Sequence, residues 1–137
     1  MSYASLGAEF PRLAARLAHM PEDEVADGVT RLVDGALQRN GVAVPDRSPA
    51  AVEKLLWAFD DAVWKAQEDL EKGAATQSAY NQAFRRARAM SGLSELLQGR
   101  YARAAYEATQ ALYENEDVAL EYLGADNTSS DGPAGQA

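Results

Sequence analysis

The 137-residue chain contains no cysteine and a single histidine. Without cysteine it cannot form a disulfide, a thiolate metal site or a cysteine nucleophile. The histidine, His19, falls at the end of a predicted helix, where this residue more often interacts with the terminal carbonyl groups than acts as a base. A zinc site would need carboxylates almost exclusively, and a serine–histidine–aspartate triad would depend on His19. We therefore expect no catalytic residue, no metal and no cofactor.

Long hydrophobic runs and strand patterns are also missing from the sequence. No apolar stretch reaches the roughly 18 residues that a membrane-spanning helix needs. Residues 1–8 lack the basic start and apolar centre of a secretory signal. No segment alternates as a strand does, and no glycine-rich phosphate loop follows one. We therefore expect a soluble, cytoplasmic, all-α protein without a membrane partner.

Positive charge is scarce overall, since the net charge is −8. This balance argues against binding nucleic acid across a broad surface, because cations that neutralise phosphates dominate that affinity. The arginines are nevertheless concentrated: residues 76–106 carry five of them against the single acid Glu95, a net charge of +4 that leaves −12 for the rest. The five are Arg85, Arg86, Arg88, Arg100 and Arg103.

Two explanations of this basic segment remain open. The segment can pack beside the acidic face of the helix predicted for residues 49–72. Alternatively, part of it forms an anion or phosphate site, or binds an acidic partner. The candidate anion-binding residues are Arg85, Arg88, Arg100 and Arg103.

Prolines, glycines and capping residues divide the chain into about five helices. The expected ranges are about 9–19, 22–40, 49–72, 76–90 (with 78 as an alternative start) and 100–116. Pro11 is tolerated in the first turn of the first helix. The second helix carries an apolar face made of Val25, Val29, Leu32, Val33 and Leu37. The third begins at Pro49, with Ser48 as its N-cap, and stops at Gly73.

Later boundaries depend on glycine and asparagine. Ser91 and Gly92 are expected to interrupt the fourth helix. The leucines within 93–97 then belong either to a short connecting helix or to the start of the last helix, with a kink near Gly99. The last helix can restart after Asn115.

These helices are expected to form one compact bundle over residues 1–124. A chain of 137 residues is long enough for one domain with a core and too short for two ordinary ones. Residues 125–137 are small or polar, with glycine and proline and no large apolar side chain. Such a segment cannot offset the entropy lost on ordering, so we expect a disordered tail there.

Two tryptophans lie on the side of the third helix that should be polar. Its core-facing stripe has alternating spacings of four and three: Val52, Leu56, Phe59, Val63, Ala66 and Leu70. At about 100° per residue, Trp57 and Trp64 project roughly 130° away from that stripe. Their neighbours there are acidic: Glu53, Asp60, Asp61 and Glu68. Something other than the core face must therefore cover both rings.

A similar pattern occurs in the last predicted helix. Its apolar stripe consists of Tyr101, Ala104, Ala105, Ala108 and Leu112. Tyr106 and Tyr113, again seven apart, lie on the flank of that stripe. A helix with two apolar faces either is central in its own bundle or buries one face and offers the other to a partner. The sequence leaves both alternatives open.

Two pairs of carboxylates have the one-turn spacing of metal-binding helices. Glu68 and Glu71 form an E-x-x-E pair, and Glu114 and Asp117 form an E-x-x-D pair. These two four-residue windows resemble the paired motifs of all-helical nucleotide pyrophosphohydrolases. The resemblance implies a magnesium-dependent enzyme in which the four carboxylates hold the metal and the metal binds the substrate phosphates.

The function that we favour from the sequence is non-enzymatic: a protein–protein interaction module that uses an aromatic helix face. Tryptophan and tyrosine are frequent hot-spot residues, and acids beside them would select a basic partner. The partner is another protein or a second copy of the chain in a homodimer, and the role is that of an adaptor, an assembly factor or an acidic inhibitor of the immunity type. The expected partner-binding residues are Trp57, Asp60, Asp61, Trp64, Glu68, Tyr106 and Tyr113.

Overall fold

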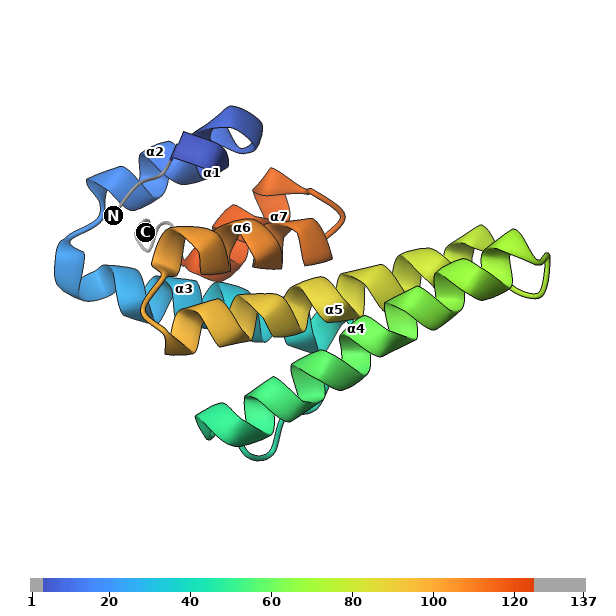
Figure 1. Ribbon diagram of the computed structural model, residues 1–137. Helices are drawn as coiled ribbons and strands as arrows, with labels where there is room; N and C mark the ends of the chain where they lie inside the picture. The colour runs from blue at the N-terminus through green and yellow to red at the C-terminus, as the bar shows by residue number, and fades with distance from the viewer. Residues whose placement is uncertain (1–3, 125–137) are drawn as a thin grey trace.

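The computed structural model describes residues 4–124, which form seven α-helices and no strand (Figure 1). The helices are α1 (Ala4–Glu9), α2 (Pro11–His19), α3 (Glu22–Arg39), α4 (Pro49–Glu71), α5 (Gln77–Leu97), α6 (Tyr101–Ala111) and α7 (Glu116–Leu123). The predicted all-α bundle is confirmed, with seven helices instead of about five. The predicted tail, 125–137, lies outside the described residues. None of the described helices is both long and apolar enough to cross a membrane.

The helices divide into a body and an arm. The body consists of α1, α2, α3, α6, α7 and the C-terminal half of α5, and it holds almost all the buried apolar side chains. The arm consists of α4 and the N-terminal half of α5. The C-terminal half of α4 and the N-terminal half of α5 extend beyond the other helices (Figure 1), whereas the N-terminal half of α4 lies beside the C-terminal half of α5. Of the described helices, α5 is the one that α4 contacts extensively. The single helix α5 therefore joins the two parts.

Pro11 separates two helices where the sequence predicted one over 9–19. Phe10, just before it, has φ −130° and ψ 70°, outside the helical region. This conformation is expected, because a proline disfavours helical geometry in the residue that precedes it. The predicted place of Pro11 in the first turn of a helix that ends at His19 is confirmed by α2. The predicted start at Glu9 is wrong, because Glu9 ends a separate helix, α1. Phe10 and Leu13 are nevertheless buried in the core.

Two predicted helices are confirmed closely by α3 and α4. The predicted apolar face of α3 is buried at all five positions: Val25, Val29, Leu32, Val33 and Leu37. Helix α4 begins at Pro49 and ends at Glu71. Gly73 follows with φ +74°, a left-handed conformation that glycine adopts without strain and that stops the helix.

Gly92 does not interrupt a helix, contrary to the prediction from the sequence. Helix α5 runs unbroken through it, and the leucines within 93–97 complete its last turns. A Cβ atom on Gly92 would lie 3.3 Å from the carbonyl oxygen of Ala104 and 3.4 Å from the amide nitrogen of Ala108, both in α6. The missing side chain therefore lets the backbones of α5 and α6 approach closely. The expected kink near Gly99 is instead a complete break, since Gly99 has φ +75°.

The last predicted helix, 100–116, is divided in the structure. Helix α6 ends at Ala111, and Tyr113 and Glu114 adopt positive φ values of 63° and 58°, which an α-helix cannot contain. The expected restart after Asn115 is confirmed by α7. The Asn115 side chain caps it by accepting a hydrogen bond of 3.2 Å from the Val118 amide.

Replacing Gly92 with leucine tests the close approach of α5 and α6. We expect the free energy of unfolding to fall by about 1–3 kcal/mol, because the new side chain must displace backbone atoms of α6. The matched control is Ala79→Leu, which adds leucine at an exposed position of the same helix and should change stability by less than about 0.5 kcal/mol. Urea unfolding measures both variants. Equal stabilities would show that the two backbones do not meet in this way.

Candidate functional site

Helix α4 buries a single side chain over its whole length, that of Val52. The rest of its predicted core stripe, which contains Phe59 and Val63, is only partly buried against α5. Trp57 is 65% exposed and Trp64 is 71% exposed. No described part of the chain covers these two rings, so the alternative in which they pack against another helix of their own bundle is wrong.

The two tryptophans share one ridge of α4 with acidic and amide side chains. Spacings of four and three place the following residues on this ridge, which we call the acidic–aromatic ridge: Glu53, Trp57, Asp60, Trp64, Gln67 and Glu71. The ridge contains no lysine or arginine. The two lysines of α4 and Lys72, which follows its last residue, lie on the neighbouring ridge, whose members are Lys54, Ala58, Asp61, Lys65, Glu68 and Lys72.

Two hollows lie between the acidic–aromatic ridge and α5. The first has a volume of about 440 Å³ and is lined by Pro49, Val52, Glu53, Leu56, Trp57, Asp60, Ser94, Leu97 and Gln98. The second has a volume of about 390 Å³ and is lined by Trp57, Asp60, Asp61, Val63, Trp64, Gln67, Tyr80, Phe84, Ala87 and Arg88. Trp57 and Asp60 line both hollows, so the two hollows are neighbours along α4, and we refer to them together as the groove.

The α5 side of the groove is also apolar. The Tyr80 and Phe84 rings stack with centroids 6.3 Å apart, and Leu97 is 44% exposed in the first hollow. The sequence placed Tyr80 and Phe84 on a helix face but did not assign them to a binding surface. Their spacing of four was the available signal, yet only the pairing of α4 with α5 shows which surface they share with Trp64.

The carboxylates of α4 have no cationic partner among the described residues. Within residues 4–124, no lysine or arginine forms an ion pair with an acid of this helix, including Glu53, Asp60 and Asp61. The basic segment of residues 76–106 does pack beside α4, through α5, and Arg88 lines the same hollow as Asp60 and Asp61. Its described arginines nevertheless form their ion pairs with other acids. The groove wall keeps its negative charge.

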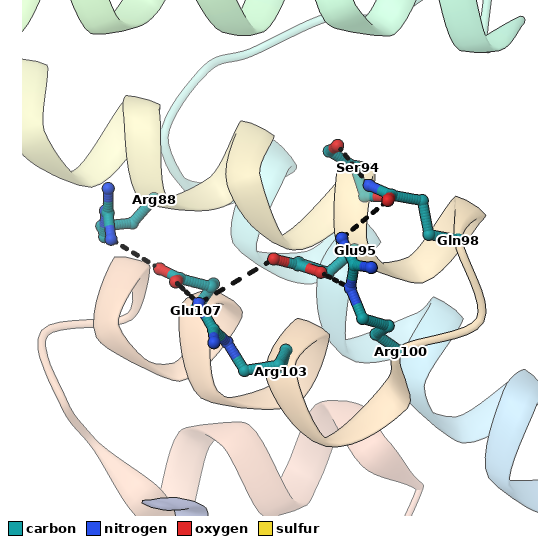
Figure 2. Close-up of polar contacts among 7 residues, drawn as sticks. All are labelled: Arg88, Ser94, Glu95, Gln98, Arg100, Arg103 and Glu107. Atoms are coloured by element: carbon teal, nitrogen blue, oxygen red, sulfur yellow. Dashed lines mark hydrogen bonds and ion pairs between the residues drawn. The ribbon is translucent and has the colours of Figure 1, made fainter. Parts of the chain in front are cut away.

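The arginines of that segment instead contact groups in the body (Figure 2). Arg88 pairs with Glu107 at 2.8 Å, Arg100 pairs with Glu95, and Arg103 lies 3.9 Å from both carboxylates. The Arg85 guanidinium lies 3.9 Å from the centroid of the Tyr113 ring. Three of the four candidate anion-binding arginines thus already face carboxylates. Anion binding by this set stays a prediction that the observed contacts do not favour.

Glu107 is the buried centre of this network. Its side chain is 5% exposed, and burial raises the pKa of its carboxyl, while the charges of Arg88 and Arg103 act in the opposite direction. Arg88 also lines the second hollow of the groove. A single side chain therefore connects the groove wall to a buried acid of the body.

The two tyrosines predicted to flank one helix face are separated. The Tyr106 hydroxyl donates a hydrogen bond of 2.7 Å to Glu9, which raises the pKa of this phenol, and its ring centroid lies 5.7 Å from that of Phe10. Tyr106 is therefore packed within the body. Tyr113 lies beyond the end of α6 and is 68% exposed. They do not form a second aromatic pair like that of α4.

The four carboxylates of the metal-binding alternative are not gathered. No group of three or more histidine, cysteine, aspartate or glutamate side chains within the described residues could hold a metal ion. Glu68 and Glu71 belong to the arm, whereas Glu114 precedes α7 and Asp117 pairs with Arg12 at 2.8 Å. The four-residue windows have the one-turn spacing but lie on helices that the fold does not bring together.

Comparison with known proteins finds no matching family model, no matching curated protein and no matching solved structure. Function is therefore inferred from the geometry and charge of the arm.

The raised pKa of Glu107 predicts a pH dependence of stability. The folded protein holds the Glu107 proton more tightly than the unfolded chain, so this group contributes stability that is lost as the pH rises through the folded pKa. We expect the free energy of unfolding of the wild type, relative to that of Glu107→Gln, to increase as the pH falls from about 7 towards the ordinary glutamate value of 4.5. Urea unfolding at several pH values measures this difference. A constant difference over that range would contradict the effect of burial.

Proposed function

We propose that the protein is a non-enzymatic interaction module that binds another polypeptide through the groove of its arm. The observation that carries the proposal is the exposure of Trp57 and Trp64, at 65% and 71%, on a helix that buries one side chain. Burying an aromatic side chain contributes about 1.5–3 kcal/mol. Two tryptophans in one groove therefore supply the kind of anchor that dominates small interfaces.

The partner that fits is a different polypeptide and not a second copy of the chain. In an antiparallel twofold pairing that places Trp57 opposite Trp64 of the other copy, the axis passes between Asp60 and Asp61. Four carboxylates would then meet at the axis. A parallel pairing places each acid of the ridge opposite itself. Because the acidic–aromatic ridge contains no cation, self-association leaves these charges unneutralised.

Several cellular roles use such a surface. An adaptor, an assembly factor and an acidic inhibitor of the immunity type each bind one partner through a preformed face. The absence of cysteine supports a location in the cytoplasm. The groove is shared by all three roles, so tests at the groove address them together.

Replacing both tryptophans with serine tests whether the pair belongs to a binding surface or to the hydrophobic core. We expect Trp57→Ser with Trp64→Ser to keep its helical circular dichroism and to change the free energy of unfolding by less than about 1 kcal/mol, because both side chains are mostly exposed. The wild type should be a monomer by light scattering, with red-shifted tryptophan emission. An unfolded double variant would show that the pair belongs to the core.

Site-directed photo-crosslinking in the native host tests the groove directly. A photo-reactive residue at Gln67, which lines the second hollow, should crosslink to a different polypeptide. The same residue at Gln38, which is exposed on α3 of the body, is the matched control and should give no such product. The product should disappear when Trp57 and Trp64 are replaced with serine, because the anchors are lost. No product from Gln67, or the same product from both positions, would contradict a docking function for the arm.

A further inference from the structure

The spacing of the two hollows defines what can enter them. On α4, the first hollow is lined by residues from Pro49 to Asp60 and the second by residues from Trp57 to Gln67. The second hollow is therefore displaced along the helix by seven to eight residues. At 1.5 Å per helical residue this offset is about 11 Å, or two turns. Trp57 and Asp60 form the shared wall between the hollows. An occupant must therefore present two apolar side chains about two helical turns apart.

The walls of the groove favour a helix over an extended segment. Both walls are α-helices, whose backbone groups are already bonded within each helix, so they offer no edge with which a strand could pair. An extended chain would place unpaired amide and carbonyl groups against Leu56, Trp57 and Phe84. A helix satisfies its own backbone and presents side chains at i and i+7 on one face.

The charge of the groove selects the sign of the occupant. The first hollow is lined by Glu53 and Asp60, and the second by Asp60 and Asp61. These three carboxylates have no ion pair within residues 4–124, whereas the one cation of the lining, Arg88, is held by Glu107 at 2.8 Å. Covering unpaired carboxylates without a counter-charge is unfavourable. Lysine or arginine beside the apolar anchors of the occupant removes that cost.

Resting on the proposed docking function, we infer that the groove between α4 and α5 receives a basic amphipathic helix of a different protein. Its apolar side chains at i and i+7 enter the hollows on either side of Trp57, and its cationic side chains lie against Glu53, Asp60 and Asp61. Electrostatic attraction speeds association and makes it sensitive to salt. The tryptophans supply the apolar anchor, and the carboxylates exclude neutral and acidic helices.

Two synthetic helical peptides test this inference. Both carry the same leucines at i, i+4, i+7 and i+11 and contain no tryptophan; one has lysine and arginine at its remaining polar positions, and its twin has glutamate there. Binding is followed through the emission of Trp57 and Trp64. We expect the cationic peptide to shift the emission to the blue, to bind at least about tenfold more tightly than its twin, and to weaken as salt is raised.

Variants of the chain locate the interaction. Glu53→Gln with Asp60→Asn should remove most of the preference for the cationic peptide. Asp27→Asn with Glu121→Gln makes the same change of net charge at exposed positions of the body. This control variant should keep the preference for the cationic peptide. Asp61→Asn in the second hollow should weaken the preference partly. Equal effects of the two double variants would show that the preference depends only on the net charge of the protein. That result would overturn the proposed binding of the peptide at the groove.

The outcomes separate this inference from the docking function on which it rests. If the glutamate twin binds as tightly, or if neither peptide binds while the Gln67 crosslink forms, the basic helix is wrong and the docking function stands. If Gln67 gives no crosslink at all, the docking function itself is contradicted. If light scattering gives the mass of a dimer and the tryptophan emission is blue-shifted, the groove binds a second copy of the chain and the inference is overturned. A salt-sensitive preference for the cationic peptide that is lost in the Glu53 and Asp60 variant supports it.

Discussion

The close contact between α5 and α6 is the constraint on which the arrangement of the molecule depends. Both helices meet through small residues, with Gly92 on one side and Ala104 and Ala108 on the other. This contact fixes the C-terminal half of α5 within the body. Because α5 continues unbroken towards its N-terminus, the same contact also fixes the direction in which the arm extends. The placement of α4, and with it the groove, follows from a missing side chain some distance away.

The body pairs several of its charges internally, whereas the described acids of α4 form no ion pair. Glu95 and Glu107 are paired with arginines of α5 and α6, and Tyr106 is bonded to Glu9. On α4, by contrast, the acids lie beside exposed indole rings and have no cation opposite them in residues 4–124. Exposed apolar patches on a protein surface often mark interaction sites. The combination of exposed indole rings and unpaired carboxylates is the observation that supports the docking function proposed for the arm.

Sequence reasoning succeeded where the signal is local. The ends of α4 follow from Pro49 and Gly73, and the angle of Trp57 and Trp64 to the core stripe predicts that they lie off the core face. Whether another helix of the bundle covers them was left open by the sequence and is decided by the structure. It failed where the same residue type serves two purposes. Gly73 stops a helix, whereas Gly92 admits a neighbouring backbone, and only tertiary contacts tell them apart. For the same reason the α5 wall of the groove and the pairing of Arg88 with Glu107 could not be predicted. Both depend on which faces of which helices pack together, and the sequence does not show this.

The single buried side chain of α4 has a consequence for cooperativity. The free energy that keeps a segment closed comes largely from the apolar surface that it buries. Val52 is the one fully buried side chain of α4, and Leu55, Leu56 and Phe59 pack against the core while only partly buried. Opening α4 therefore costs less than opening α3 or α6, whose faces are buried along their lengths. We therefore expect amide hydrogens of α4 to exchange with solvent through openings that leave α3 and α6 folded. We expect an occupant of the proposed groove to lower this exchange, because it would bind the closed form.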